Sequence, residues 1–109
     1  MKQKPVVRRR RADDDIESAV SYYLNQAGAE VASNFVDQFE EAVVKISTQP
    51  AAGSTRFGHE LQIASLRQWP IKHFPYLIFY IEKERHIEIA RVLHTSVDMF
   101  SRFDPDDVD

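Results

Sequence analysis

The spacing of apolar residues predicts two consecutive helices in the N-terminal half of the chain. In residues 16–24 apolar side chains recur at i, i+4, i+7 and i+8, the interval of one helical face, and Gly28 follows as a natural C-terminal stop. A second apolar stripe runs through residues 31–46 and ends before Gln49-Pro50. Because only a very short turn separates the two, we expect an antiparallel helical hairpin.

An acidic run, Asp13 to Asp15, lies where the first helix is expected to begin. Asp14 and Glu17 have the spacing of a capping box, and carboxylates near a helix N-terminus are stabilised by the helix dipole. Carboxylates on successive residues point in different directions and chelate a metal poorly. We therefore interpret the run as a helix start and not as a metal site.

The C-terminal half has the shorter patterns of strands. Residues 66–69, 76–81 and 86–93 are candidate strands, and residues 4–10 contain a further short strand at or near a sheet edge. The polar tetrad 82–85 makes the last two strands a hairpin. Residues 51–63 have little periodicity and are expected to form a loop.

The predicted order is thus β-α-α-β-β-β, an α+β fold in which a helical hairpin covers one face of an antiparallel sheet. Residues 1–100 are expected to form a single domain. Residues 101–109 form an acidic C-terminal tail, for which disorder and shielding of a basic surface are both open interpretations.

The composition excludes several kinds of functional site. The 109 residues include no cysteine, which excludes disulfides, thiolate nucleophiles and cysteine-ligated metals. The chain has no common nucleotide-binding or hydrolase motif, and its four histidines lack metal-ligand spacing. We therefore expect no metal and no cofactor. We also expect no membrane association and a cytoplasmic location, because no apolar run is long enough to span a bilayer and the N-terminus lacks the pattern of a signal peptide.

Charge is unevenly distributed along the chain. The formal net charge is −3, from 14 Lys and Arg against 17 Asp and Glu. Residues 1–11 carry six cations and no anion, whereas residues 101–109 carry one arginine against four aspartates. A mildly acidic protein with this distribution can still present a local basic surface to an anionic partner, although a solvated strand edge explains the basic N-terminus equally well.

Arg91 is the most informative single residue, because it stands inside an otherwise apolar strand and needs a partner there. The strand period of two places Arg91 and His94 on opposite faces, which argues against a catalytic Arg/His pair. The residues expected to share the face of Arg91 are Ile87, Ile89 and Leu93. A structural ion pair with Glu88 or with an acidic residue of the helices is as plausible as a functional role.

Three segments and the order of the elements together resemble the RelE/ParE toxins of bacterial type II toxin–antitoxin systems. The segments are LRQWP (residues 66–70), FPYLIFY (74–80) and IEIARVLH (87–94), with Asp98 shortly after the last. The resemblance extends over about residues 6–99 and is closer to the ParE branch than to the RelE branch.

The two branches imply different mechanisms. ParE-like toxins are non-enzymatic inhibitors that bind DNA gyrase, stabilise its cleaved-DNA complex and stop replication, and the family is associated with plasmid stabilisation. RelE-like toxins cleave messenger RNA on the ribosome, and that alternative would give catalytic roles to Arg67, Arg91 and His94. Only Arg56 and His59 lie in the segment where RelE-like enzymes carry a cluster of lysines, so we expect a ParE-like binding inhibitor. A non-toxic family member that only binds an antitoxin is the third possibility.

In every case the resemblance implies a cognate antitoxin and a hetero-oligomer with it, in addition to gyrase, or to the ribosome and mRNA, as the target. The residues expected to contact the target are Arg56, Arg67, Lys72, Arg91 and His94. The residues expected to contact the antitoxin are Arg8, Arg10, Tyr22, Tyr23, Val31 and Phe35.

Overall fold

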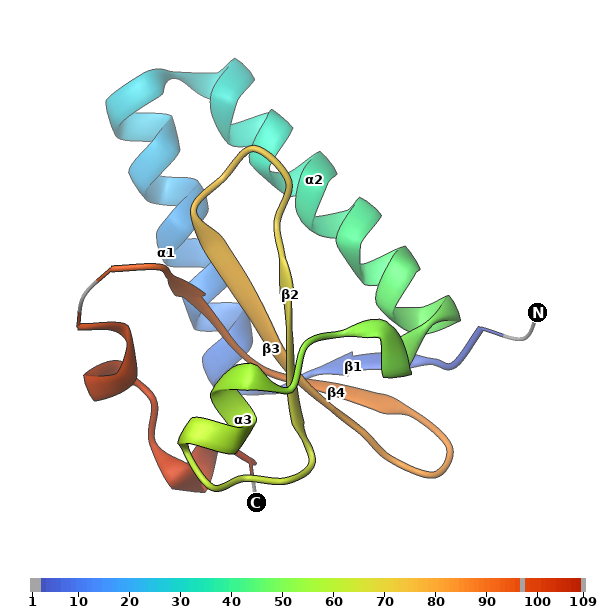
Figure 1. The fold of residues 1–109 in the computed structure, drawn as a ribbon. Helices are drawn as coiled ribbons and strands as arrows, with labels where there is room; N and C mark the ends of the chain where they lie inside the picture. Colours follow the sequence, from blue (N-terminus) through green and yellow to red (C-terminus); the bar gives the residue numbers. More distant parts are fainter. Residues whose placement is uncertain (1–2, 97, 109) are drawn as a thin grey trace.

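A hairpin of two long helices lies against one face of a four-stranded sheet (Figure 1). The computed structural model describes residues 3–96 and 98–108. The helices and strands are β1 (Val6–Arg8), α1 (Arg10–Ala27), α2 (Ala29–Thr48), α3 (Arg56–Glu60), β2 (Leu66–Pro70), β3 (Tyr76–Glu82) and β4 (Ile87–His94). Three short 3₁₀ turns are η1 (Pro50–Ala52), η2 (Met99–Arg102) and η3 (Pro105–Val108). The α+β class and the order of the main elements are confirmed.

The sheet has the strand order β1-β4-β3-β2 and is mixed. The pairs β2–β3 and β3–β4 are antiparallel, as expected for a meander with short connections. β1 instead pairs with β4 in parallel, Val6 opposite Ile87, so the expectation of a purely antiparallel sheet is wrong for this strand. A parallel pair requires a long crossover, and the chain provides one because α1, α2, α3 and two strands lie between β1 and β4.

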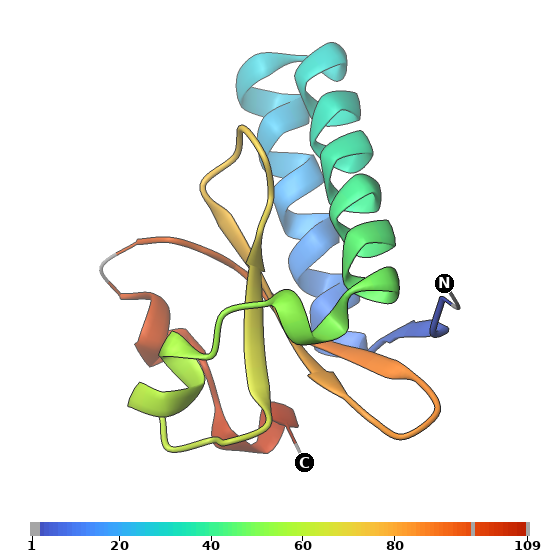
Figure 2. The ribbon, with the colours of Figure 1, turned by 45° about the vertical axis from the view of Figure 1, so that its right-hand side comes forward.

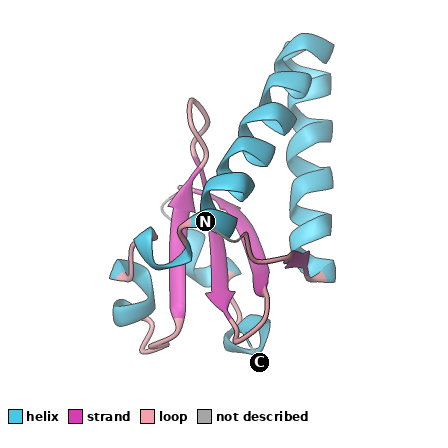
Figure 3. Cartoon of the chain, turned by 90° about the vertical axis from the view of Figure 1, so that its right-hand side faces the viewer, coloured by secondary structure: helices cyan, strands magenta, loops and turns pink. Residues whose placement is uncertain are grey.

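The helical hairpin forms as the periodicity predicts. Gly28 ends α1 with a φ of 94°, a left-handed conformation that favours glycine, and α2 begins at the next residue. Figures 2 and 3 show the two helices side by side and extending beyond the end of the sheet. The predicted capping box is wrong: α1 begins at Arg10, its N-cap is Arg9, and no side chain caps it.

The helices bury their apolar faces against the sheet in what we call the helix-side core. Phe35, Phe39 and Ile46 of α2 meet strand residues such as Ile78 and Ile89 there, and all of these side chains are buried. Removing this apolar area from water supplies most of the free energy that orders the hairpin.

The opposite face of the sheet carries a second apolar cluster, the outer core. It is covered by α3 and by residues 99–107, which lie together on this side (Figure 2). Its buried members are Leu66, Phe79, Ile81, Leu93, Met99 and Phe103. The segment 51–63, expected to be a loop, therefore contains η1 and α3. Only five residues long, α3 is too short for its periodicity to appear in the sequence.

A β-bulge divides β4 into two halves with different facing. Phe79 pairs with Arg91 but Tyr80 pairs with Ile89, which leaves Ala90 as an extra residue. Ile89 therefore belongs to the helix-side core, while Arg91 faces the other side of the sheet. The expectation that Ile87 and Ile89 share the face of Arg91 is wrong for this reason, whereas Leu93 does lie on the outer face.

Candidate functional site

Arg91 is the centre of a buried ion cluster. The residue is only 5% exposed, and its Nε and Nη2 atoms donate to the two carboxylate oxygens of Asp15 at 2.7 and 2.9 Å. Its Nη1 atom donates to Asp107 Oδ2 at 3.0 Å and to the carbonyl of Arg102 at 2.8 Å. The hydrogen bond to Asp15 is the main reason that the pKa of Arg91 is raised above its usual value. Arg91 therefore remains charged, and its partners come from α1 and from the C-terminal segment.

Asp15 occupies the place of a missing strand neighbour. β1 ends at Arg8 and the chain turns into α1, so the edge of β4 beyond Ile89 has no strand beside it. Asp15 Oδ2 accepts the Val92 N–H at 3.0 Å and binds Arg91 at the same time. The one carboxylate thus satisfies both a backbone donor and a buried cation, which a strand backbone alone would not do.

Three arginines converge on Asp107, whose side chain is 2% exposed. We call Arg9, Arg11 and Arg91 the arginine cluster. Arg11 Nη1 lies 2.7 Å from Asp107 Oδ1, Arg91 Nη1 lies 3.0 Å from Oδ2, and Arg9 donates to the Asp107 carbonyl. Arg9 also binds Glu88 at 2.6 Å. The opposite charges of the two chain ends were visible in the sequence, but their meeting around Arg91 was not.

Arg67, expected to contact the target, faces the helix side of the sheet. Its cross-strand partner is Tyr80, a member of the helix-side core, and its Nη1 donates to the Gly53 carbonyl at 2.8 Å. The Tyr80 hydroxyl donates to the Pro50 carbonyl at 2.7 Å, and burial raises the pKa of Tyr80 to about 12. Tyr80 and Arg67 thus hold η1 at its two ends, at Pro50 and at Gly53.

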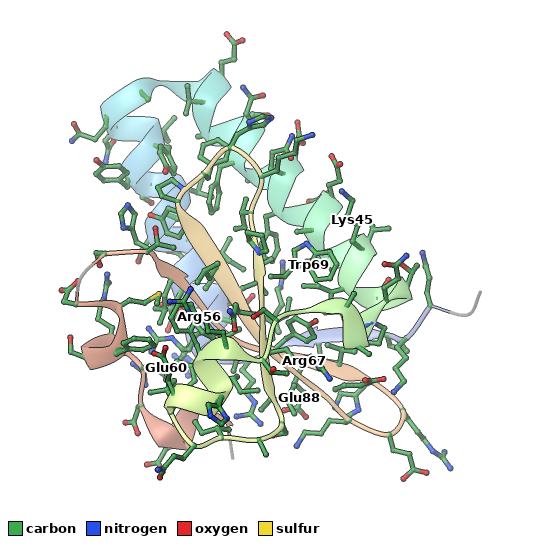
Figure 4. The ribbon with its side chains drawn as sticks, viewed as in Figure 1. Lys45, Arg56, Glu60, Arg67, Trp69 and Glu88 are labelled. Carbon is green, nitrogen blue, oxygen red and sulfur yellow. The ribbon has the colours of Figure 1, made fainter. Side chains whose placement is uncertain are left out.

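The remaining expected target contacts are dispersed over the molecule. Arg56, on α3, is 75% exposed in its side chain and lies 3.8 Å from Glu60 (Figure 4). Lys72 is exposed in the connection between β2 and β3. His94 is half-buried at the end of β4, where its ring meets Tyr76 edge to face at 5.2 Å. The structure does not bring the five residues of the expected set together.

The expected antitoxin contacts divide into exposed and buried side chains. Tyr22 is 57% exposed, and Arg8 and Arg10 are exposed, with Arg8 2.9 Å from Asp13. Tyr23 and Val31 are half-buried. Phe35 is fully buried in the helix-side core, 5.5 Å from the Tyr23 ring, so it supports the hairpin from inside.

A groove of about 150 Å³ runs between α1 and the end of β4, and we call it the α1–β4 groove. It unites Tyr22 and His94, one residue from each expected set. Its other polar lining residues are Asp15, Ser18, Tyr76 and Arg102. Sequence reasoning missed Ser18 and Arg102, which carry no signal of their own in a polar helix face and an acidic tail.

Two absences apply to the described residues. Among residues 3–96 and 98–108, no group of three or more histidine, aspartate or glutamate side chains is arranged to hold a metal ion. Within the same part of the chain, no helix has both the length and the apolar character needed to cross a membrane.

The fold is that of a small α+β protein in which a helical hairpin covers a sheet with a parallel edge strand. Residues 6–99 match the family model described as "ParE toxin of type II toxin-antitoxin system, parDE". The chain therefore belongs to the ParE toxin family, which confirms the resemblance to the ParE branch.

A solved structure described as the chromosomal ParDE TA system from P. aeruginosa has the same fold. It matches with a TM-score of 0.72 and 19% sequence identity, covering 86% of this chain and 98% of the other. No curated protein sequence gave a match. At this sequence identity the structural match shows a shared fold and nothing further.

Proposed function

We propose that the protein is a toxin that inhibits DNA gyrase by binding, and that a cognate antitoxin neutralises it. Membership of the ParE family, over residues 6–99, supports the toxin class. The observation that carries the choice of mechanism is the placement of Arg67 and Arg91, two of the three residues to which an RNase mechanism would give catalytic roles.

Arg67 and Arg91 point to opposite faces of the sheet. Residues paired directly across two strands share a face. Arg67 pairs with Tyr80 of the helix-side core, whereas Arg91 pairs with Phe79 of the outer core. Groups on opposite faces of one sheet do not reach the same phosphodiester, and general acid–base catalysis requires hydrogen-bond distance to the reacting atoms.

In addition, most of the N–H groups of Arg91 already donate hydrogen bonds within the protein. Its guanidinium donates to Asp15, Asp107 and the Arg102 carbonyl, so few of its five N–H groups are left for a substrate phosphate. Arg67 and Arg91 therefore do not form a joint phosphate clamp, and inhibition by occupying a surface of the target does not require one. This supports the gyrase proposal over the ribosome-dependent RNase.

For the antitoxin we propose a docking surface on the hairpin. Tyr22 and Leu24 of α1 are both more than half exposed, and the α1–β4 groove begins beside Tyr22. Large apolar side chains exposed next to a groove suit an amphipathic segment that folds on binding. Arg8, at the end of β1, and Arg10, at the start of α1, are exposed and would attract acidic residues of the same segment.

The test is expression of the chain with and without its antitoxin in the same cells. We expect growth arrest, trapped gyrase–DNA breaks and a DNA-damage response without the antitoxin, with translated messages intact. Cut messages without breaks would instead establish the RNase alternative. Neither effect would leave only the role of an antitoxin-binding partner. A Tyr22→Ala variant, compared with Asn25→Ala one turn along the same helix, tests the antitoxin surface by co-purification.

A further inference from the structure

The C-terminal residues 99–107, which we call the latch, close over the outer face of the sheet. All of the latch except Met99 lies beyond the part of the chain that matches the family model. Two kinds of contact hold it. Phe103 packs on Phe79 at a ring distance of 5.3 Å, and the Asp107 carboxylate binds Arg11 and Arg91.

The surface under the latch has the chemistry of a peptide-binding site. Besides the Asp107 carboxylate, the arginine cluster contacts two backbone carbonyls of the latch, those of Arg102 and Asp107. Forked guanidinium groups suit such sets of carboxylate and carbonyl oxygens. The outer core beside them takes an aromatic ring four residues before the carboxylate.

The charge balance favours a single carboxylate over a nucleic acid. The three cations of the arginine cluster lie against Asp15 and Glu88, which bind Arg91 and Arg9. One net positive charge remains, and one carboxylate neutralises it. The phosphodiester backbone of a nucleic acid would have to approach both of these carboxylates and would be repelled by them.

The secondary structure and exposure of the latch suit a segment that can detach from the outer face of the sheet. Its secondary structure is two 3₁₀ turns, which have poorer hydrogen-bond geometry than an α-helix. Phe100, Asp104 and Asp106 are exposed along it. Removing the Asp107 carboxylate would therefore loosen the C-terminal end of the latch, while Met99 and Phe103 still pack in the outer core.

We propose that the outer face of the sheet is a docking site for an acidic peptide segment that carries an aromatic residue four positions before an aspartate. The chain's own latch occupies this site and competes with such a segment from a partner. The proposal goes beyond gyrase inhibition and does not depend on it, because its test measures peptide binding and not toxicity.

The test is the binding of a labelled peptide to the full-length protein, followed by fluorescence anisotropy. The probe is MFSRFDPDDVD, the sequence of residues 99–109. In the wild-type protein the latch competes at the effective concentration of a tethered segment, on the order of millimolar. Asp107→Asn weakens this competitor and leaves the arginine cluster intact, so we expect the peptide to bind at least tenfold more tightly than to the wild type.

Asp106→Asn is the matched control, because it removes the same charge from an exposed neighbour, whereas the ion pairs to Arg11 and Arg91 come from Asp107. It should bind the peptide as the wild type does. Phe103→Ala, which weakens the apolar half of the latch, should also increase binding and provides a second route if the Asp107 variant folds poorly. Circular dichroism verifies that each variant is folded, and hydrogen exchange of residues 99–107 verifies that the latch is released in Asp107→Asn and Phe103→Ala but not in Asp106→Asn.

Equal peptide affinity of the wild type and of both folded, latch-released variants would overturn the proposal. So would a peptide with Asn in place of Asp107 that binds as tightly as the acidic one. A single-stranded DNA oligonucleotide that binds the Asp107→Asn variant in preference to the peptide would overturn the assignment of the ligand class.

Discussion

Replacing Arg91 by methionine should destabilise the protein strongly. Methionine keeps the unbranched stem but removes every hydrogen bond from Arg91 to Asp15 and Asp107, so the buried Asp107 carboxylate and the partly buried Asp15 carboxylate each lose a partner. Breaking a buried ion pair by deleting one member costs about 3–5 kcal/mol. Asp15 keeps the Val92 N–H, and Asp107 keeps Arg11 and the Asp104 N–H, so the lower end of that range applies, about 3 kcal/mol.

Urea denaturation at neutral pH measures this loss. With a slope of roughly 1–2 kcal/mol per molar urea, a loss of about 3 kcal/mol moves the midpoint by roughly 1.5–3 M. The matched control is Arg56→Gln, because Arg56 is mostly exposed and lies 3.8 Å from Glu60. A pair of that kind contributes about 0–1 kcal/mol, and the control should stay near the wild type.

A double-mutant cycle shows whether the loss arises at the named contact. Arg91→Met and Asp15→Asn, alone and together, should give a coupling free energy of about 1–3 kcal/mol. An Arg91→Met protein within about 0.5 kcal/mol of the Arg56→Gln control, a size typical of surface substitutions, would refute the structural role assigned to the ion cluster.

Three further predictions concern single contacts. Gly53→Ala should cost about 1–3 kcal/mol in thermal unfolding, because its Cβ would meet the buried Tyr80 hydroxyl, and Gly28→Ala should cost about 1 kcal/mol through its positive φ alone. Since burial raises the pKa of Tyr80 to about 12, stability present below pH 10 should fall as pH rises from about 10 to 12, and Tyr80→Phe should flatten this part of the stability curve measured in urea. Hydrogen bonds from His86 and Arg9 lower the pKa of Glu88, so its contribution is present above about pH 4.5 and is lost on acidification; Glu88→Gln should be less stable at pH 6 and less sensitive to acid below pH 4.5.

Local patterns in the sequence were sufficient for the helices and the meander. The apolar stripes that end at Gly28 and before Gln49 predict the C-terminal ends of α1 and α2, although α1 begins at Arg10, ahead of the acidic run where its start was expected. The polar tetrad after β3 likewise places the turn to β4. Each of these features depends on residues close in the chain, which is why periodicity and turn chemistry reveal them.

Contacts between distant residues could not be predicted in the same way. Asp15 looked like part of a helix start, but its carboxylate serves Arg91 and Val92, 76 and 77 positions away. The bulge at Ala90 has no sequence mark, and it reverses the face of the second half of β4. For Arg91 the pattern did reveal the need of a partner, and an acidic residue of a helix was among the alternatives, but not the additional partner in the C-terminal segment.

The most direct test of the proposed function uses purified full-length protein, purified DNA gyrase and a supercoiled plasmid. We expect the protein to increase the amount of linear plasmid recovered after the gyrase–DNA complex is denatured, and the cognate antitoxin to abolish the effect. A translation reaction run in parallel with the same protein should leave its message uncut. Message cleavage at codons in the ribosome, with gyrase unaffected, would contradict the proposal that this toxin acts by binding gyrase.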